Sequence, residues 1–549
     1  MMVIKGLGVS PGVVMGALRF LENKPVTIRR ENINDVENEL ARFEKARNIA
    51  YAQLDELYHE AMNKAGSKSA AVFDIHKMML DDLDYRECVT DMVYAQKVNA
   101  EYAVNLTAEK FAGMFSSMED VYMQGRAADV FDISERILKA LMPVLSNTFV
   151  LNAPCILIAR DIAPSEAVNL DKSMILGFAT AEGSFNSHTS ILARSMGIPA
   201  VVGMGDALTT ELDGKPAILD GFTGALHIDP DKETTETMLR RIREIQEKQK
   251  ALDALKNYPS VTLDGKKIDV FANVNDLSGL DKAIENGAGG IGLFRSEFLY
   301  LQRNDYPAED ELFAVYKQAA ERMEGKKLII RTLDIGADKQ AGYFNLPEEK
   351  NPALGLRAIR ICLIRPEIFK TQLRALYRAS AFGNIAIMFP MICSEREVAD
   401  ILKITEEIKS DLRRVNTPFN EKTELGIMIE TPAAVMISDE LAKMVDFFSI
   451  GTNDLTQYAL AVDRQNNRLS RFYDPRHPAI RKMVEMTVKS AHEAGIWVGI
   501  CGELAADSEL TETFLRIGVD ELSVATDMLL PLKEKILSLD LRKPYELSG

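Results

Sequence analysis

The run Phe447-Phe-Ser-Ile-Gly-Thr-Asn-Asp454 is a short apolar segment that ends directly on polar residues. A run of this kind, bounded by glycine, is typical of a buried strand. Similar runs recur between residues 260 and 549, with helix-length segments between them, at 268–272, 290–294, 327–331, 385–389, 425–429, 447–450, 496–500 and 519–524. Eight alternating strand and helix units in a stretch of this length predict a TIM (β/α)8 barrel. A doubly wound open sheet is the alternative, but it does not need eight such units.

Polar residues follow five of these expected strands. They are Arg295, Arg331 with Asp334, Glu430, Asn453 with Asp454, and Cys501 with Glu503. Active sites of TIM barrels lie at the C-terminal ends of the strands, whereas polar residues placed by chance would be as common at the N-terminal ends. The pattern therefore predicts an active site at the C-terminal end of the barrel.

The residue types in this stretch indicate an anionic substrate and a divalent cation. The arginines that could fork around a phosphate and a carboxylate are Arg295, Arg331, Arg357 and Arg464. Glu430 and Asp454 offer the hard oxygen ligands that Mg²⁺ takes together with a substrate phosphate. Singly, an arginine is more often a surface or salt-bridge residue, and Asn453 and Asp454 could equally cap a helix. The combination favours a binding site.

Gly287-Ala-Gly289-Gly-Ile-Gly292 matches the dinucleotide fingerprint G-x-G-x-x-G. That fingerprint needs a strand, a turn and then a helix. Here the order is reversed, because a helical segment at 280–286 ends at Gly287 and a strand follows. We interpret Gly287 as a helix C-cap and reject a nicotinamide cofactor.

A second candidate site lies between Glu182 and Gly197. Ser187 is a plausible helix N-cap, which puts His188 at a helix N-terminus where free N–H groups and the dipole favour a phosphate. Neutral imidazole is a competent nucleophile near neutral pH. Thr189 and Arg194 could contact the phosphoryl oxygens. A lone histidine is more often structural, so spacing alone leaves both interpretations open.

The remaining sequence divides into segments that differ in composition and in hydrophobic pattern. No proline occurs between Pro25 and Pro143, and that stretch is charged and rich in Met and Ala, which predicts helices. One apolar stripe at helical spacing is predicted on its first helix, formed by Val36, Leu40, Phe43, Ala50, Leu54 and Leu57. It is a structural bundle or a docking surface, with Asp74, Asp81, Asp82, Asp84 and His76 as candidate surface residues. Residues 149–227 alternate short apolar runs with turns and predict a small α/β domain. A charged helical segment bracketed by Pro230 and Pro259 predicts a linker helix.

Composition narrows the function classes. The net charge of −16 argues against nucleic-acid and anionic-membrane surfaces. No apolar run reaches the roughly 20 residues of a membrane span, and the N-terminus does not read as a signal peptide. The five cysteines and six histidines are isolated from one another, which disfavours zinc and indicates free thiols in a reducing cytoplasm.

Several long motifs, taken in order, resemble those of enzyme I, the phosphoenolpyruvate–protein phosphotransferase family of the bacterial sugar phosphotransferase system. They are Ser187-His-Thr-Ser-Ile-Leu-Ala-Arg194, Gly292-Leu-Phe-Arg-Ser-Glu-Phe298, Arg331-Thr-Leu-Asp-Ile-Gly336, Asn351-Pro-Ala-Leu-Gly-Leu-Arg357, Ile427-Met-Ile-Glu-Thr-Pro432, Phe447-Phe-Ser-Ile-Gly-Thr-Asn-Asp-Leu-Thr-Gln457 and Cys501-Gly-Glu-Leu504. The resemblance covers nearly the whole chain.

The resemblance implies a multidomain α/β fold. Residues 1–20 and 146–229 would form a swivelling phosphohistidine α/β domain, and the inserted residues 21–145 would form a helical bundle that binds the phosphocarrier protein HPr. Residues 230–259 would be the linker helix. Residues 260–549 would be the TIM barrel, which binds phosphoenolpyruvate and Mg²⁺ and forms a homodimer.

The resemblance also implies a role for each matching site residue. His188 would be the phosphorylated nucleophile and Cys501 the acid that protonates the enolate carbon to give pyruvate. The substrate-binding residues would be Arg295, Arg331, Arg357, Asn453 and Arg464, and the metal ligands Glu430 and Asp454. A thiol is protonated at neutral pH and suits the acid role.

Two features depart from the family pattern. Glu182 and Asn186 stand where relatives commonly have glycine and threonine before the Ser-His pair, and Glu182 adds negative charge near a phosphate site. The chain also stops at Gly549, where relatives usually continue by another helix, so the sequence leaves barrel closure and dimer strength open. Pyruvate phosphate dikinase and phosphoenolpyruvate synthase share the histidine domain and barrel but also need an ATP-grasp domain, for which the sequence before the helical insert has no room. A non-catalytic scaffold would be expected to have lost His188, Cys501 or the metal carboxylates.

Overall fold

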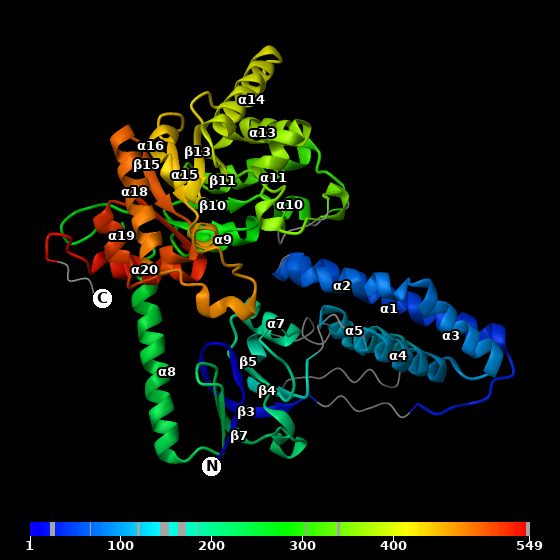
Figure 1. Cartoon of the computed structure of the whole chain (residues 1–549). Coiled ribbons are helices and arrows are strands. Elements are labelled where there is room, and N and C mark those ends of the chain that lie inside the picture. Colours follow the sequence, from blue (N-terminus) through cyan, green and yellow to red (C-terminus); the bar gives the residue numbers. More distant parts are fainter. Residues whose placement is uncertain are drawn as a thin grey trace. The chain divides into compact units, whose positions relative to one another are not determined.

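The computed structural model describes residues 1–21, 28–65, 67–117, 121–142, 153–162, 172–185, 187–301, 303, 305–336, 341–347 and 349–544. The chain folds as two compact units, Met1–Gln246 and Glu247–Gly549 (Figure 1). The boundary falls inside helix α8 (Lys232–Asp253).

An eight-stranded mixed sheet organises the first unit, in the order β1-β8-β7-β3-β4-β5-β6-β2. Its strands are β1 (Met2–Lys5), β2 (Leu7–Ser10), β3 (Val13–Phe20), β4 (Cys155–Ala159), β5 (Ile175–Thr180), β6 (Ala200–Val202), β7 (Pro216–Asp220) and β8 (Ala225–Ile228). β3 pairs in parallel with β4, so the N-terminal residues and the stretch after the helical insert share one sheet. The expected α/β domain is therefore present, and β1 to β3 belong to it.

Helices occupy the insert between β3 and β4. They are α1 (Val36–Ala65), α2 (Ser67–Leu80), α3 (Leu83–Gln96), α4 (Ala100–Ser116) and α5 (Val121–Leu141). The stripe predicted on the first helix is confirmed at Phe43, Ala50 and Leu54, which are buried in a core with residues of the other four helices. The side chain of Leu57 lies outside the described residues.

His76 of α2 is part of this helical core. Its ring nitrogens lie 3.1 Å from an Asp129 carboxylate oxygen and 3.3 Å from one of Asp132. Burial lowers the pKa of His76, but the hydrogen bonds of these two carboxylates outweigh it and the pKa is raised. The prediction that His76 sits at a docking face was wrong, because its side chain is fully buried.

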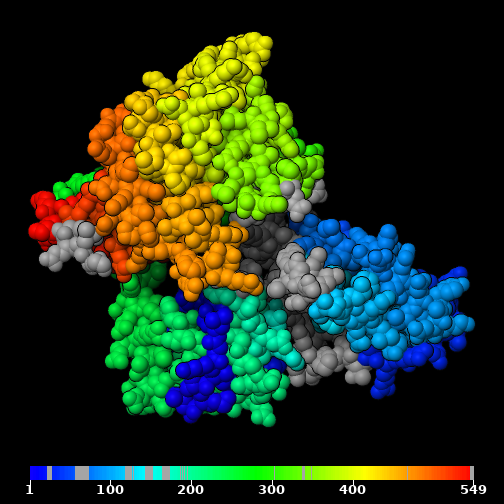
Figure 2. Space-filling model, in the orientation of Figure 1, coloured from blue at the N-terminus to red at the C-terminus, as the bar shows by residue number. Residues whose placement is uncertain are grey.

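The predicted linker helix is α8. Most of its side chains are exposed, and its green atoms are in view in Figure 2. Arg241 on its first half donates to the buried carboxylate of Asp220 at 2.6 Å, which ties the start of the helix to the end of β7. Leu252, near its end, is buried. A polar, exposed helix of 22 residues agrees with the expected linker rather than a core helix.

The second unit contains a closed barrel of eight parallel strands, which confirms the TIM barrel and excludes the open sheet. The strands are β9 (Asp269–Val274), β10 (Ile291–Arg295), β11 (Leu328–Arg331), β12 (Ile385–Phe389), β13 (Glu424–Ile429), β14 (Phe447–Ile450), β15 (Trp497–Ile500) and β16 (Glu521–Ala525). β16 pairs with β9 and completes the barrel. Each expected strand lies within two residues of its observed bounds.

Helices follow the strands around the barrel. They are α9 (Leu277–Glu285), α10 (Phe298–Leu301), α11 (Glu309–Arg322), α12 (Ile359–Ile364), α13 (Pro366–Ala379), α14 (Glu395–Arg414), α15 (Pro432–Met436), α16 (Ser438–Leu441), α17 (Thr452–Leu460), α18 (Pro478–Ala494), α19 (Thr511–Ile517) and α20 (Leu529–Leu537). Gly287 follows α9 with φ +72°, in the left-handed conformation expected after a helix, so the fingerprint match is coincidental. Among the described residues, no helix is both long and apolar enough to cross a membrane.

Glycines on the strands make room for large side chains inside the barrel. Phe447 stacks on Trp497 with ring centroids 4.5 Å apart. A Cβ atom on Gly426 would lie 2.4 Å from the Phe447 ring. The ring cannot give way easily because Trp497 is packed against it.

We therefore expect Gly426→Ala to lower the free energy of unfolding by about 1–3 kcal/mol through overpacking. Chemical denaturation of the full chain measures this loss. Gly342→Ala is the matched control, since a Cβ there meets no atom within 4 Å. Equal stability of the two variants would contradict the packing argument.

Candidate active site

Arg331 is the buried cation at the C-terminal end of β11. It pairs with Glu297, which lies after β10, and with Asp334 at 2.9 Å. Burial lowers the pKa of Arg331, but the charges of Asp334 and Glu297 outweigh it, so the pKa is raised. The guanidinium therefore remains charged inside the barrel mouth.

Asp334 joins Arg331 to a second predicted arginine. Its other carboxylate oxygen accepts from Arg357 at 3.0 Å. Arg357 also donates to the Tyr458 hydroxyl at 3.0 Å and lies 3.6 Å from Asp454. Tyr458 in turn donates to the carbonyl of Ala353 at 2.5 Å. These contacts hold both guanidinium groups in place before any ligand binds.

Glu430 and Asp454 form the carboxylate part of the site. Glu430 follows β13 and is fully buried, with one oxygen accepting from the Met391 amide at 2.6 Å. Its Oε2 atom has no hydrogen-bond partner among the described residues. Burial, followed by the charges of Asp454 and Asp334, raises the pKa of Glu430.

An unpartnered buried carboxylate oxygen beside a second carboxylate fits a divalent cation. In the described part of the chain, no group of three or more His, Cys, Asp or Glu side chains forms a metal cluster. Two carboxylates suffice for Mg²⁺ when substrate oxygens and water complete its shell. The residues present therefore fit the expected metal.

The other two arginines lie around this core. Arg295, at the end of β10, donates to Asn275 at 3.3 Å, and its pKa is lowered by burial and by the charge of Arg331. Arg464 lies 3.9 Å from an Asp454 oxygen. A cavity of about 470 Å³ is lined by Arg357, Asp454 and Arg464 among other residues of the same loops. Arg357 and Arg464 thus border one open space that a small anion can enter, whereas Arg295 and Arg331 are not among its lining residues.

Asn453 lies in the first turn of α17, whose N-cap is Gly451. The alternative that Asn453 or Asp454 caps this helix was therefore wrong. The Asn453 amide exchanges two hydrogen bonds with Glu503, at 3.0 Å from Nδ2 to a carboxylate oxygen and at 2.9 Å from the Glu503 amide. Glu503 follows β15, so this pair ties together two loops of the barrel mouth.

Cys501 directly follows β15 and is only 3% exposed. Its thiol donates weakly to the Ile450 carbonyl at 3.8 Å. Burial, opposed by the nearby Ser449 hydroxyl, raises the pKa of Cys501 to about 12. Asn273 holds the Cys501 carbonyl at 3.0 Å. The side chain is thus a protonated thiol at a defined position, as the acid role requires.

The second candidate site begins helix α7 (His188–Met196). Ser187 is its N-cap, as expected, and Gly197 ends it in the left-handed conformation. The backbone of His188 therefore lies at a helix N-terminus, while its side chain is outside the described residues. Thr189 is buried and donates to Asp161 at 2.9 Å, so its hydroxyl is already engaged.

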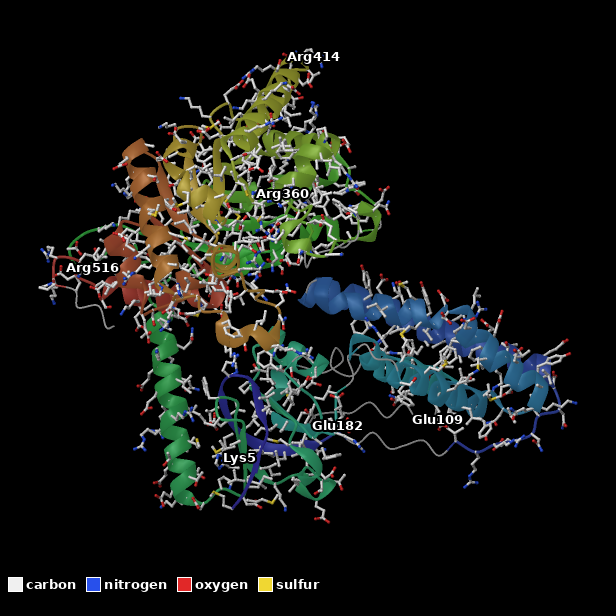
Figure 3. The ribbon with its side chains drawn as sticks, viewed as in Figure 1. Lys5, Glu109, Glu182, Arg360, Arg414 and Arg516 are labelled. Atoms are coloured by element: carbon white, nitrogen blue, oxygen red, sulfur yellow. The ribbon has the colours of Figure 1, made fainter. Side chains whose placement is uncertain are left out.

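Arg194 and Glu182 flank this helix start. Arg194 donates to the Phe185 carbonyl at 3.0 Å and lies over the Phe185 ring. Glu182, labelled in Figure 3, pairs with Arg160 at 2.6 Å. The extra negative charge noted in the sequence is therefore matched by a neighbouring cation. Asn186 lies outside the described residues.

The structure brings together the barrel residues that the sequence singled out and adds three others. Glu297 pairs with Arg331, Tyr458 orients Arg357, and Asn273 holds the Cys501 backbone. Glu297 could have been found, because it lies in the run that also contains Arg295. Tyr458 and Asn273 carry no sequence signal of this kind, since single tyrosines and asparagines are common in any chain.

Asp334→Asn tests the link between the two arginines. We expect kcat/KM for the anionic substrate to fall by about 10²-fold, because both guanidinium groups lose the charge that positions them. The unfolding free energy should fall by about 3 kcal/mol, because a buried ion pair is broken. Steady-state kinetics and denaturation measure the two effects. Asp281→Asn, which removes a surface ion pair with Arg322, should change neither.

Comparison with known proteins agrees with this geometry. A family model described as "PEP-utilising enzyme, PEP-binding domain" matches residues 249–541. The N-terminal and mobile domains of PEP-utilising enzymes match residues 5–126 and 151–224. A phosphoenolpyruvate-protein phosphotransferase of Priestia megaterium is 40% identical over 98% of this chain and 94% of its own length. The chain belongs to the phosphoenolpyruvate-protein phosphotransferase family.

A second curated relative and a solved structure are also similar to this chain. The Bacillus subtilis (strain 168) phosphoenolpyruvate-protein phosphotransferase is 40% identical over 98% of this chain and 95% of its own length. The solution structure of the enzyme I protein nEIt is 34% identical, covers 44% of this chain and 99% of its own, and superposes with a TM-score of 0.38. In the present chain, the region matched by the PEP-binding domain, residues 249–541, contains all of the barrel residues discussed above.

Proposed function

We propose that this protein transfers the phosphoryl group of phosphoenolpyruvate to His188 and then to the phosphocarrier protein HPr, releasing pyruvate. The observation that carries the proposal is the buried Arg331–Asp334–Arg357 network, which lies with Glu430, Asp454 and Cys501 at the C-terminal ends of the barrel strands. The names of the family members support the reaction.

The four arginines would bind the substrate through its charges. Phosphoenolpyruvate carries a phosphate and a carboxylate, and a guanidinium can form two parallel hydrogen bonds with either group. Arg295, Arg331, Arg357 and Arg464 supply the positive charge, and Asn453 offers an amide for a phosphate oxygen. Because the arginine network is preformed, little side-chain ordering remains to oppose binding.

Glu430 and Asp454 would hold Mg²⁺. When bound, Mg²⁺ neutralises charge on the phosphate and on the enolate oxygen that develops as the phosphate leaves. The unpartnered Oε2 of Glu430 supports this assignment.

His188 and Cys501 would act in sequence. A ring nitrogen of His188 attacks phosphorus, and the bond from phosphorus to the enol oxygen breaks, leaving the enolate of pyruvate. The Cys501 thiol then gives its proton to the methylene carbon, which becomes the methyl group of pyruvate. The high pKa of Cys501 ensures that the thiol carries this proton when the substrate arrives.

Phosphohistidine must then reach HPr. We propose that residues 1–20 and 146–229 swing between the barrel and the helical residues 21–145, with residues 230–259 as the arm. Asp74, Asp81, Asp82 and Asp84 are exposed on the helical insert and could steer a basic carrier surface. The proposal includes a homodimer formed through the barrel and a cytoplasmic location.

Radiolabelled phosphoenolpyruvate with Mg²⁺ and the purified full chain tests this function. We expect one acid-labile, alkali-stable phosphoryl label per chain and an equal amount of pyruvate. Added HPr should then remove the label from the protein. Absence of label, or labelling from ATP alone, would refute the proposed function.

A further inference from the structure

A polar seam runs through the otherwise apolar interior of the barrel. Most interior side chains form an apolar cluster: Phe271, Leu293, Ile329, Ala386, Met388, Met428 and Phe447. On one side of the interior, however, Ser449, Glu521, Ser523 and Asn273 are polar, and they lie on β14, β16 and β9. This seam meets Cys501 at the barrel mouth, because Asn273 and Ser449 both contact that residue.

Glu521 is the ionisable member of the seam. It is 2% exposed, and its Oε1 atom has no hydrogen-bond partner among the described residues. Its carboxyl group occupies the space left by two glycines. A Cβ atom on Gly499 would lie 1.9 Å from Oε2, and one on Gly292 would lie 2.5 Å from Oε1. Gly292 and Gly499 thus provide the space that this carboxyl group fills inside the barrel.

The surroundings of Glu521 favour the neutral acid. Burial and the charge of Asp269 raise its pKa well above the usual value, while Lys327 opposes the rise. Lys327 is itself paired with Glu424 at 2.8 Å. Asp269 is the cross-strand neighbour of Glu521, and its side chain is half exposed at the N-terminal end of the barrel. One side of Glu521 therefore faces a group that is in contact with water.

The other side of Glu521 faces the Cys501 thiol. The Glu521 carboxyl lies across Gly499 of β15, and Cys501 directly follows that strand two residues later, so positions 499 and 501 are on the same face. Ser449 is the cross-strand partner of Gly499, and its buried hydroxyl lies near the thiol and has no hydrogen-bond partner among the described residues. Ser449 and Glu521 are therefore the two cross-strand neighbours of Gly499, and the Glu521 carboxyl lies over Gly499 on the side of the strand that leads to the thiol.

We propose that Glu521 is the proton store that reloads Cys501, with the Ser449 hydroxyl as the bridge. This inference rests on the proposed function, in which Cys501 protonates the enolate. Cys501 is only 3% exposed, so the replacement proton comes from within the barrel rather than from bulk water. The Cys501 thiolate takes the Ser449 hydroxyl proton, and Ser449 takes the Glu521 proton. Water at Asp269 then restores the Glu521 acid, so that one solvent proton enters for each proton given to pyruvate.

Two exchange rates measured on the same full-length protein test the relay. The first is the exchange of radiolabelled pyruvate into phosphoenolpyruvate with Mg²⁺, which the proposed function predicts in the absence of HPr. It needs no solvent proton, because the thiolate left by one substrate can take a methyl proton from the next pyruvate. The second is the incorporation of deuterium from heavy water into the pyruvate methyl group, which does require Cys501 to exchange its proton with solvent.

Glu521→Gln keeps the shape of the side chain but cannot pass on a proton. We expect deuterium incorporation to fall at least about tenfold relative to carbon exchange. Ser449→Ala should lower the same ratio, because it removes the bridge and leaves the acid in place. A purely structural role for Glu521 would slow both exchanges by the same factor and leave their ratio unchanged. An unchanged ratio in Glu521→Gln overturns the relay.

Two further variants separate the relay from the proposed function. Cys501→Ala should stop both exchanges. If the wild-type protein shows no carbon exchange, the proposed function itself has failed. Glu424→Gln, which changes another carboxylate near the N-terminal end of the barrel, should leave the ratio at its wild-type value. The same fall of the ratio in Glu424→Gln as in Glu521→Gln would overturn the specific role of Glu521.

Discussion

His188→Ala is expected to abolish phosphoryl labelling of this protein by phosphoenolpyruvate. Alanine has no nucleophile, and a phosphate cannot be transferred to a methyl group. The fold should survive, because alanine is the best helix former and α7 keeps its N-cap Ser187 and its terminal Gly197. The loss should be complete rather than partial, since no other group is proposed to accept the phosphate. Incubation with radiolabelled phosphoenolpyruvate and Mg²⁺ measures it.

A matched control is available on the barrel. His492 is a partly exposed histidine that pairs with Asp520 at 3.0 Å, away from the strand ends that carry the site. His492→Ala should label as fully as the wild type. Label retained by His188→Ala, or lost equally from His492→Ala, would show that a different residue accepts the phosphate.

Cys501→Ala should slow pyruvate formation by about 10²–10⁴-fold, the usual contribution of a positioned general acid. Substrate binding should remain close to wild type, because the arginine network is held by Glu297, Asp334 and Tyr458 rather than by the thiol. The affinity for phosphoenolpyruvate and the rate of pyruvate release, measured separately, distinguish the two effects. Normal pyruvate release would remove Cys501 from the acid role.

Cys362→Ala controls for the loss of a buried thiol. Cys362 of α12 is fully buried in the same unit, so its truncation should cost stability and leave pyruvate formation unchanged. The pH dependence gives a second check. A thiol with an ordinary pKa of about 8.5 would lose its proton in mild alkali, whereas burial raises the pKa of Cys501 to about 12. The acid form of Cys501 therefore persists as the pH rises, and pyruvate formation should show no loss from its ionisation near that ordinary value.

The barrel was predictable because its strands are buried on both sides. Runs such as Ile385–Phe389 are continuously apolar, and the glycines and polar residues that follow mark their ends. The helical insert was predictable for a related reason, since proline is absent and an apolar stripe recurs with helical spacing. His76 was wrongly predicted to lie at the surface because charged and polar residues lie beside it in the sequence. In the fold, its buried ring packs against Asp129 and Asp132 of α5.

The site was predictable where one rule applied, namely that functional side chains follow the strands of a TIM barrel. Arg295, Arg331, Glu430 and Cys501 all obey it. Tyr458 was not predicted because its role depends on a hydrogen bond from Arg357, which is 101 positions earlier in the chain. Glu521 was not predicted because it lies at the N-terminal end of its strand, where the rule places no functional side chains.

By itself, the sequence determined the family, the alternation of strands and helices, and the identity of the charged groups at the barrel mouth. Each of these depends only on the local residue pattern or on the order of the motifs along the chain. The tertiary structure alone decided how those groups are paired and protonated. Asp334 holds two arginines, one Glu430 oxygen has no hydrogen-bond partner among the described residues, and burial inside the barrel raises the pKa of Cys501 and of Glu521. Pairing and pKa depend on distance and on exclusion of water, and these exist only once remote strands have closed around a common interior.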